Sequence, residues 1–182
     1  MQTEIIVSGF GGQGALFAGQ ILAYAAMDEG LHVTWIPSYG PEMRGGTAHC
    51  TVIISPDEIG SPLVRCPLAA IALNQPSLDK YETVVAAGGV LLVNASLLTR
   101  RPTRADIRVV EIPANAIAEE LGNVRLANLV LTGALLAATG VLSVAAVERA
   151  LAAHLPERHK HLLAANYQAL RRGAALVTAE TA

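Results

Sequence analysis

The sequence predicts an α/β fold, a three-layer sandwich in which helices cover both faces of a mostly parallel, Rossmann-like sheet. The chain starts with a short apolar strand at 4–8, a glycine-rich turn at 9–14 and an apolar helix at 15–27. Strands then alternate with helices over the first two thirds of the chain, which is the pattern of a parallel sheet, and the last third is helical. Because no internal repeat or low-complexity linker interrupts the 182 residues, we expect a single domain over 1–182.

The next elements follow from local signals along the chain. Alternating residues predict a strand at 32–36, and two prolines with three glycines make 37–46 a loop. The β-branched strand at 47–55 follows this loop without a crossover helix, so we expect it to run antiparallel at an edge of the sheet. Apolar runs and helix signals place the other elements, which are strands at 68–73, 88–94 and 108–112 and helices at 75–81, 113–120, 126–138, 143–154 and 157–172.

The composition indicates a protein that hides much of its surface. Hydrophobic residues make up 52% of the chain and charged residues 15%, whereas an ordinary soluble domain carries about 25% charged residues. Polar residues and glycines interrupt the uncharged segment 126–147, which predicts two buried helices rather than a membrane span. With no signal-peptide pattern, we expect a cytoplasmic protein that is buried against partner chains and does not contact a membrane. A net charge of −2 gives no electrostatic footprint for nucleic acid.

The cysteines and histidines do not predict a metal site. Cys50 and Cys66 lie sixteen residues apart, and an iron–sulfur cluster needs about four closely spaced thiolates. The five histidines are scattered, although two of them belong to the basic run 158–161 at the start of the C-terminal helix. We interpret this run as a solvated helix face. Because cations are slightly unfavourable at a helix N-terminus, the run is also compatible with an acidic neighbour.

The glycine-rich turn has the spacing of a phosphate-binding loop. Glycines there would let a ligand approach the backbone, and free N–H groups of the following helix would face it; the alternative is a tight turn that holds no ligand. A dinucleotide site also needs an acidic residue at the end of the second strand. That strand ends in Trp35-Ile36-Pro37, and Asp28 and Glu29 precede it, which disfavours a nicotinamide cofactor. The candidate residues of the turn are Gly9, Gly11, Gly12, Gln13 and Gly14.

Two glycine-rich segments carry a resemblance to a known family. They are Gly9-Phe10-Gly11-Gly12-Gln13-Gly14 and Ser38-Tyr39-Gly40-Pro41-Glu42-Met43-Arg44-Gly45-Gly46, and a strand at 48–55 follows the second. Their order and spacing resemble those of the gamma subunit of 2-oxoacid:ferredoxin (acceptor) oxidoreductases. The segments around Asn74, Asn128 and Asn166 are also similar to this family, so the resemblance covers almost the whole chain.

The resemblance implies a subunit of an enzyme rather than a complete enzyme. The family oxidatively decarboxylates a 2-oxoacid, passes electrons to ferredoxin or a similar acceptor and forms an acyl-coenzyme A. Thiamine diphosphate with Mg²⁺ lies between the alpha and beta subunits, and Fe-S clusters lie in beta or in a small delta subunit. This chain would then bind none of these cofactors alone, which agrees with its lack of cluster cysteines. On overall resemblance we favour 2-oxoglutarate slightly over pyruvate and branched-chain 2-oxoacids.

The two glycine-rich loops together form the candidate binding site. If the first two strands are neighbours and parallel, both loops lie at one end of the sheet, where open α/β folds place their ligands. Coenzyme A has phosphates that free N–H groups and an arginine would bind, but the same loops would equally serve as a contact with a partner subunit. We predict no catalytic residue and no metal ligand in this chain. The candidate contact residues beyond the first turn are Tyr39, Glu42, Arg44, Gly45 and Gly46.

Two other functional classes stay open on the sequence alone. One is a free-standing α/β module that binds an anion, a nucleotide or a partner without redox chemistry. The other is a flavin or nicotinamide enzyme with a Rossmann fold. An absorption spectrum of the purified protein would separate a flavin protein from the rest, and native co-purification would separate a subunit from a free-standing module.

Overall fold

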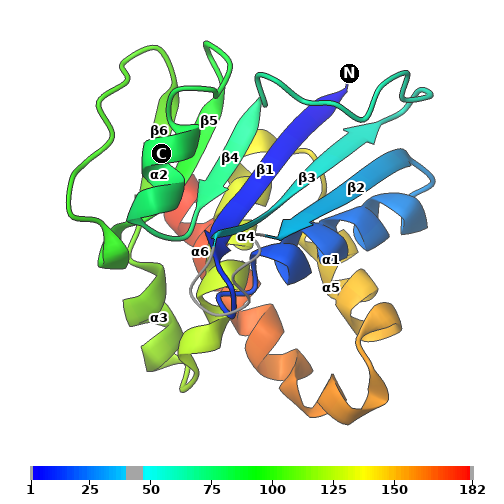
Figure 1. The fold of residues 1–182 in the computed structure, drawn as a ribbon. Helices are drawn as coiled ribbons and strands as arrows, with labels where there is room; N and C mark the ends of the chain where they lie inside the picture. Colours follow the sequence, from blue (N-terminus) through cyan, green and yellow to red (C-terminus); the bar gives the residue numbers. More distant parts are fainter. Residues whose placement is uncertain (1, 40–46, 181–182) are drawn as a thin grey trace.

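One mixed sheet runs through the protein, whose structure is a computed structural model that describes residues 2–39 and 47–180 (Figure 1). Within these residues the sheet has six strands in the order β2-β3-β1-β4-β5-β6. β1, β4, β5 and β6 are parallel to one another, and β3 is antiparallel to both of its neighbours. The strands are β1 (Thr3–Phe10), β2 (His32–Tyr39), β3 (Thr47–Ser55), β4 (Ala69–Ala72), β5 (Val90–Asn94) and β6 (Arg108–Ile112).

The strand predicted at 47–55 is β3, and it runs antiparallel as expected, but the prediction that it lies at the edge of the sheet is wrong, because the edge strand is β2. β3 lies one place further in, where it pairs with β1 on one side and with β2 on the other. Its residues Cys50, Val52 and Ile54 are buried, as expected for an interior strand. β2 contains Pro37, which has no N–H to donate to a further strand, and an edge position suits such a residue.

The condition that the first two strands be neighbours, on which the joint placement of the two loops was based, is therefore not met, because β3 lies between β1 and β2. Since β3 runs antiparallel to both, β1 and β2 still point in the same direction. Their last residues, Phe10 and Tyr39, pair with Thr47 and Ala48 at the start of β3. β1 and β2 thus finish at the same end of the sheet, two strand positions apart.

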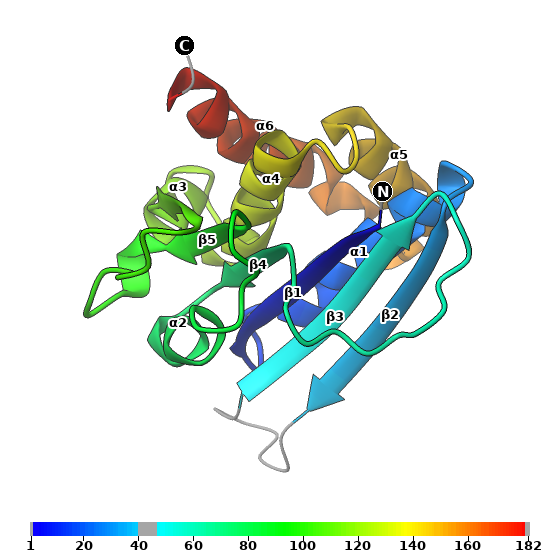
Figure 2. The same cartoon turned by 90° about the horizontal axis from the view of Figure 1, so that it is seen from above.

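Helices cover both faces of the sheet, which confirms the predicted sandwich (Figures 1 and 2). α1 and α4 pack on one face, with α5 against α1 and α6 against α4, and α2 packs on the other face near β4. The predicted last helix, 157–172, is a 3-10 segment followed by α6. The helices are α1 (Ala15–Asp28), α2 (Gln75–Tyr81), α3 (Ala114–Glu120), α4 (Ala127–Thr139), α5 (Val144–His154) and α6 (Leu163–Glu180), and the 3-10 segments are η1 (Ala95–Leu97), η2 (Val124–Leu126) and η3 (Glu157–Leu162).

The uncharged segment 126–147 spans α4 and the start of α5, as predicted. α4 ends where Gly140 adopts a left-handed conformation with φ 66°, and α5 begins where the Ser143 hydroxyl accepts a hydrogen bond of 3.0 Å from the Ala146 N–H. Most residues of α4 are buried against the sheet and α6, so their apolar character belongs to the core. Among the described residues, no helix is both long enough and apolar enough to cross a membrane.

Two glycines let α4 and α6 pack backbone to backbone. A Cβ atom at Gly133 of α4 would collide with the backbone carbonyl of Leu170 on α6. In the same way, a Cβ atom at Gly173 of α6 would collide with the backbone carbonyl of Val130 on α4. Both glycines are buried, so this close approach holds α6 against the helix that covers the sheet.

Replacing Gly173 with alanine is expected to destabilise the protein, although alanine favours a helix interior by about 1 kcal/mol over glycine. Overpacking a close contact costs about 1–3 kcal/mol, so we expect a net fall in the free energy of unfolding, measured by urea titration. Gly60→Ala is the matched control, because no atom lies within 4 Å of a Cβ built there. A Gly173→Ala protein as stable as this control would show that α6 moves away from α4 without cost.

Candidate functional site

The glycine-rich turn lies at the end of β1, where the parallel strands present their carboxyl ends. Gly12 and Gly14 have φ angles of 95° and 79°, a left-handed conformation that glycine adopts without strain. Gly9 serves a different purpose, because a Cβ there would lie 2.9 Å from both the Gln13 side-chain oxygen and the Leu73 side chain. The turn therefore needs glycine at two positions for its backbone path and at one for close contact with the end of β4.

The side chain of Gln13 ties this turn to the end of β4. Its Oε1 atom accepts a hydrogen bond of 2.7 Å from the Phe10 N–H and another of 2.7 Å from the Asn74 amide. The Asn74 Oδ1 atom in turn accepts a hydrogen bond of 2.9 Å from the Ser77 N–H and so caps α2. Gln13 is thus a structural link between the turn, two strands and a helix on the other face.

The first turn of α1 has no side-chain cap. Gly14 occupies the N-cap position, and it has no side chain to accept the free N–H groups of the helix. The Asn128 amide of α4 instead donates a hydrogen bond of 3.0 Å to the Gly14 carbonyl. Gly11 and Gly12 next to this helix start are exposed. Uncapped N–H groups and the positive end of the helix dipole make this a place where a phosphate or carboxylate is stabilised.

A cavity of about 110 Å³ opens beside the turn. Asn94, at the end of β5, is fully buried there; its amide nitrogen donates to the Leu73 carbonyl and the Asn115 side chain, at 3.2 and 2.8 Å. The Asn94 Oδ1 atom has no hydrogen-bond partner among the described residues. Arg125 is exposed and makes no ion pair with a carboxylate in the described ranges. The cavity is lined by Gly12, Gln13, Leu73, Asn94, Asn115, Val124, Arg125 and Ala127.

The structure brings only part of the predicted site together. Gly9, Gly11, Gly12, Gln13 and Gly14 all lie at the turn, whereas Tyr39 ends β2 at the edge of the sheet, beyond β3. The predicted residues Glu42, Arg44, Gly45 and Gly46 fall outside the described residues. Asn94, Asn115 and Arg125 line the cavity but were not predicted from the sequence. An asparagine directly after a buried strand was the available signal for Asn94, since such strand ends line one edge of a parallel sheet.

The first two acidic residues after the turn pair with basic side chains of α5. Asp28 and Glu29 lie at the end of α1 that is remote from the turn. The Asp28 carboxylate is 3.0 Å from the His154 Nε2 atom, and Glu29 pairs with Arg149 at 2.6 Å. Neither carboxylate reaches the carboxyl end of the sheet, where a dinucleotide ribose would be held.

The described residues do not fit an iron–sulfur cluster. In the ranges 2–39 and 47–180, no group of three or more histidine, cysteine or acidic residues lies close enough together to hold a metal ion. Burial raises the pKa of the Cys50 thiol to about 11, which disfavours the thiolate that would bind iron. Cys66 is exposed on the connection between β3 and β4, and both cysteines are free thiols.

The fold and its glycine-rich turn define a mixed α/β sandwich with an uncapped helix start at the carboxyl end of its sheet. A model of the pyruvate ferredoxin/flavodoxin oxidoreductase family matches residues 4–176, and the chain belongs to this family. The resemblance seen in the sequence is therefore confirmed.

Relatives of this chain occur both as separate subunits and as part of longer chains. This chain is 38% identical over 173 residues to the 2-oxoglutarate synthase subunit KorC of Methanothermobacter thermautotrophicus. The match covers 90% of this chain and 92% of KorC. This chain is also 44% identical over 136 residues to the ketoisovalerate oxidoreductase subunit VorA of the same organism. That match covers 75% of this chain but only 28% of VorA. The gamma subunit of a keto/oxoacid ferredoxin oxidoreductase from Geobacter sulfurreducens PCA has a similar structure, with a TM-score of 0.86, 35% identity and 98% coverage of both chains.

Replacing Gln13 with alanine is expected to lower the free energy of unfolding by about 1–3 kcal/mol, because the Phe10 N–H and the Asn74 amide lose their acceptor. Gln13→Glu keeps an acceptor oxygen in the same place and should cost less. Gln168→Ala, at an exposed position of α6, is the control, and urea unfolding followed by circular dichroism is the measurement. A loss in Gln13→Ala no larger than in the control would mean that water replaces this side chain.

Proposed function

We propose that this chain is the gamma subunit of a multi-subunit 2-oxoacid:ferredoxin oxidoreductase that oxidatively decarboxylates a 2-oxoacid to an acyl-coenzyme A. The observation that carries the proposal is the match to KorC along 92% of that subunit. A second match supports it, because the corresponding segment of VorA is 28% of a longer chain. A segment similar to this chain thus occurs in VorA together with further polypeptide, which supports a role in contact with other parts of an oxidoreductase.

The electron-transfer and decarboxylation centres belong, in this proposal, to other subunits. Thiamine diphosphate, Mg²⁺ and the Fe-S clusters would lie in alpha and beta chains, with or without a delta chain, and ferredoxin or another acceptor would receive the electrons. The lack of a fitting ligand set in the described residues supports this division. We favour 2-oxoglutarate as the substrate, because the relatives that match nearly end to end are named 2-oxoglutarate synthase subunits.

The role of this chain would be assembly of the complex and contact with coenzyme A. The uncapped start of α1 and the exposed Gly12 backbone suit a phosphate, and Arg125 lines the adjoining cavity with no carboxylate partner in the described residues. Asn94 Oδ1 would accept a hydrogen bond from an N–H or O–H group of the ligand. The loop residues proposed from the sequence, Tyr39, Glu42, Arg44, Gly45 and Gly46, stay candidates for the same ligand or for a subunit contact.

Reconstitution tests the proposed function directly. The chain is mixed with the alpha-type and beta-type chains from the same organism, and reduction of methyl viologen is followed with 2-oxoglutarate, pyruvate or 3-methyl-2-oxobutanoate. We expect coenzyme A-dependent reduction only when this chain is present, with the highest rate on 2-oxoglutarate. Full activity without the chain, or failure of the chain to co-purify with the others, would contradict the proposal and favour a free-standing binding module.

Arg125→Ala is expected to raise the KM for coenzyme A about tenfold or more in the reconstituted complex, with little change in kcat. Loss of a charge-assisted hydrogen bond costs about 1.5–3 kcal/mol, and each 1.4 kcal/mol is a factor of ten. Arg108→Ala is the matched control, since Arg108 is exposed on β6 and has no ion pair in the described ranges. An unchanged KM in Arg125→Ala would show that coenzyme A does not bind in this cavity. It would leave the proposed assembly role untouched.

A further inference from the structure

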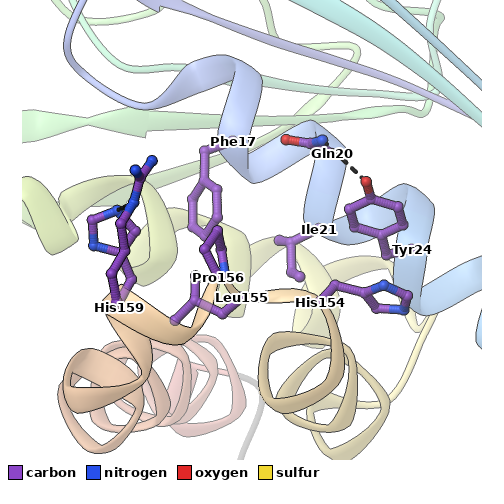
Figure 3. Close-up of a pocket in the computed structure, with 9 residues that line it drawn as sticks. Phe17, Gln20, Ile21, Tyr24, His154, Leu155, Pro156 and His159 are labelled. Carbon is purple, nitrogen blue, oxygen red and sulfur yellow. Dashed lines mark hydrogen bonds between the residues drawn. The ribbon is translucent and has the colours of Figure 1, made fainter.

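A second cavity, of about 350 Å³, lies away from the turn between α1 and the segment that joins α5 to α6 (Figure 3). It opens on the outer side of α1, and none of its residues belongs to the proposed coenzyme A contact. One wall comes from α1 and the other from the end of α5 and the start of η3. The residues that line it are Phe17, Gln20, Ile21, Tyr24, His154, Leu155, Pro156, Arg158 and His159.

The α1 wall of the cavity combines two aromatic side chains and the almost fully buried Ile21 with the polar Gln20. Its residues follow the spacing i, i+3, i+4, i+7 from Phe17 to Tyr24, which places them on one side of the helix. The Tyr24 ring stacks on the His154 ring, with centroids 4.2 Å apart and planes 8° from parallel. The His154 Nε2 atom lies 3.0 Å from the Asp28 carboxylate. Tyr24 and His154, which lie next to each other at one end of the cavity in Figure 3, therefore hold each other in place.

The other end of the cavity is basic. The Nε atom of Arg158 donates a hydrogen bond of 3.2 Å to the Nε2 atom of His159, which orients the guanidinium group. In the described part of the chain, Arg158 has no ion pair with a carboxylate. Lys160 is neutralised by Glu157 at 2.6 Å. Six other arginines have a carboxylate partner, whereas Arg65, Arg108 and Arg125 have none in the described residues; the paired ones are Arg100, Arg101, Arg104, Arg149, Arg171 and Arg172.

We infer that this cavity is a subunit interface that receives an acidic segment of a partner chain of the complex. A carboxylate of that segment pairs with Arg158, and an apolar or aromatic side chain beside it packs on Phe17. The inference rests on the proposed function, which supplies the partner chain. Charge complementarity supports it, since an oriented guanidinium without a carboxylate forms one end of a half-apolar cavity. The segment that matches this chain is 28% of VorA, so in that relative a similar domain shares its chain with further polypeptide.

Charge reversal at Arg158 tests the inference in the reconstituted complex. We expect Arg158→Glu to raise the Kd for the partner chains at least tenfold at low salt, and the difference from wild type to shrink at high salt. Arg65→Glu is the matched control, because Arg65 is exposed, lines neither cavity and has no ion pair in the described residues. Arg158→Gln should give an intermediate Kd. Circular dichroism confirms that each variant is folded.

A photo-reactive amino acid in place of His159 identifies the occupant. We expect a cross-linked peptide from a partner chain that carries aspartate or glutamate next to an apolar or aromatic residue. A Kd for Arg158→Glu within twofold of the Arg65→Glu value, or a cross-link to no partner peptide, would overturn the inference while the complex still assembles. If wild-type protein binds no partner chain at all, the proposed function fails and the inference falls with it.

Discussion

The amide of Gln13 holds the carboxyl end of the sheet in one arrangement. Its oxygen joins the N–H of Phe10 at the end of β1 to Asn74 just after β4, and Asn74 in turn caps α2 on the opposite face. The absence of a side chain at Gly9 lets the turn lie directly against Leu73. Two parallel strands and the starts of two helices therefore depend on one small network, and a change in any member moves the site as a whole.

This network also divides the polar groups at the site into two kinds. Gln13 and Asn74 are engaged with one another and with the backbone, so they shape the site. The N–H groups at the start of α1, the Asn94 oxygen and the Arg125 guanidinium are the groups still available to a ligand. The available set contains one full positive charge, several donors and one acceptor. Such a set suits a phosphate attached to a group with its own N–H or O–H.

Local signals were sufficient to predict most elements of this fold. The glycines of the first turn, the asparagine before α2 and the Thr139-Gly140 stop after α4 each act within a few residues of the element they begin or end. The place of β3 between β1 and β2 could not be predicted in this way, because it depends on pairing between distant segments. Pro37 was the available signal, since a residue without an N–H belongs at a sheet edge.

The candidate site was predictable to the same extent. Gln13 and the neighbouring glycines form one contiguous motif, so the sequence identified them together. Asn94 and Arg125 reach the same cavity only because β5 and η2 fold back to the turn. No local sequence pattern predicts that these distant segments come together. The same holds for the second cavity, where the α1 wall from Phe17 to Tyr24 meets residues 154–159.

The interior position of β3 has a consequence for how the chain folds. β1 precedes the other strands of the sheet, and both of its partners, β3 and β4, come after β2 in the chain. A nascent chain that ends after β2 therefore has a β1 with two open edges and no correct neighbour. Direct pairing of β1 with β2 would occupy the place of β3 and trap the chain in a wrong sheet. We therefore expect β2 and β3 to form an antiparallel pair that then docks on β1, because contacts between distant segments form more slowly than local ones.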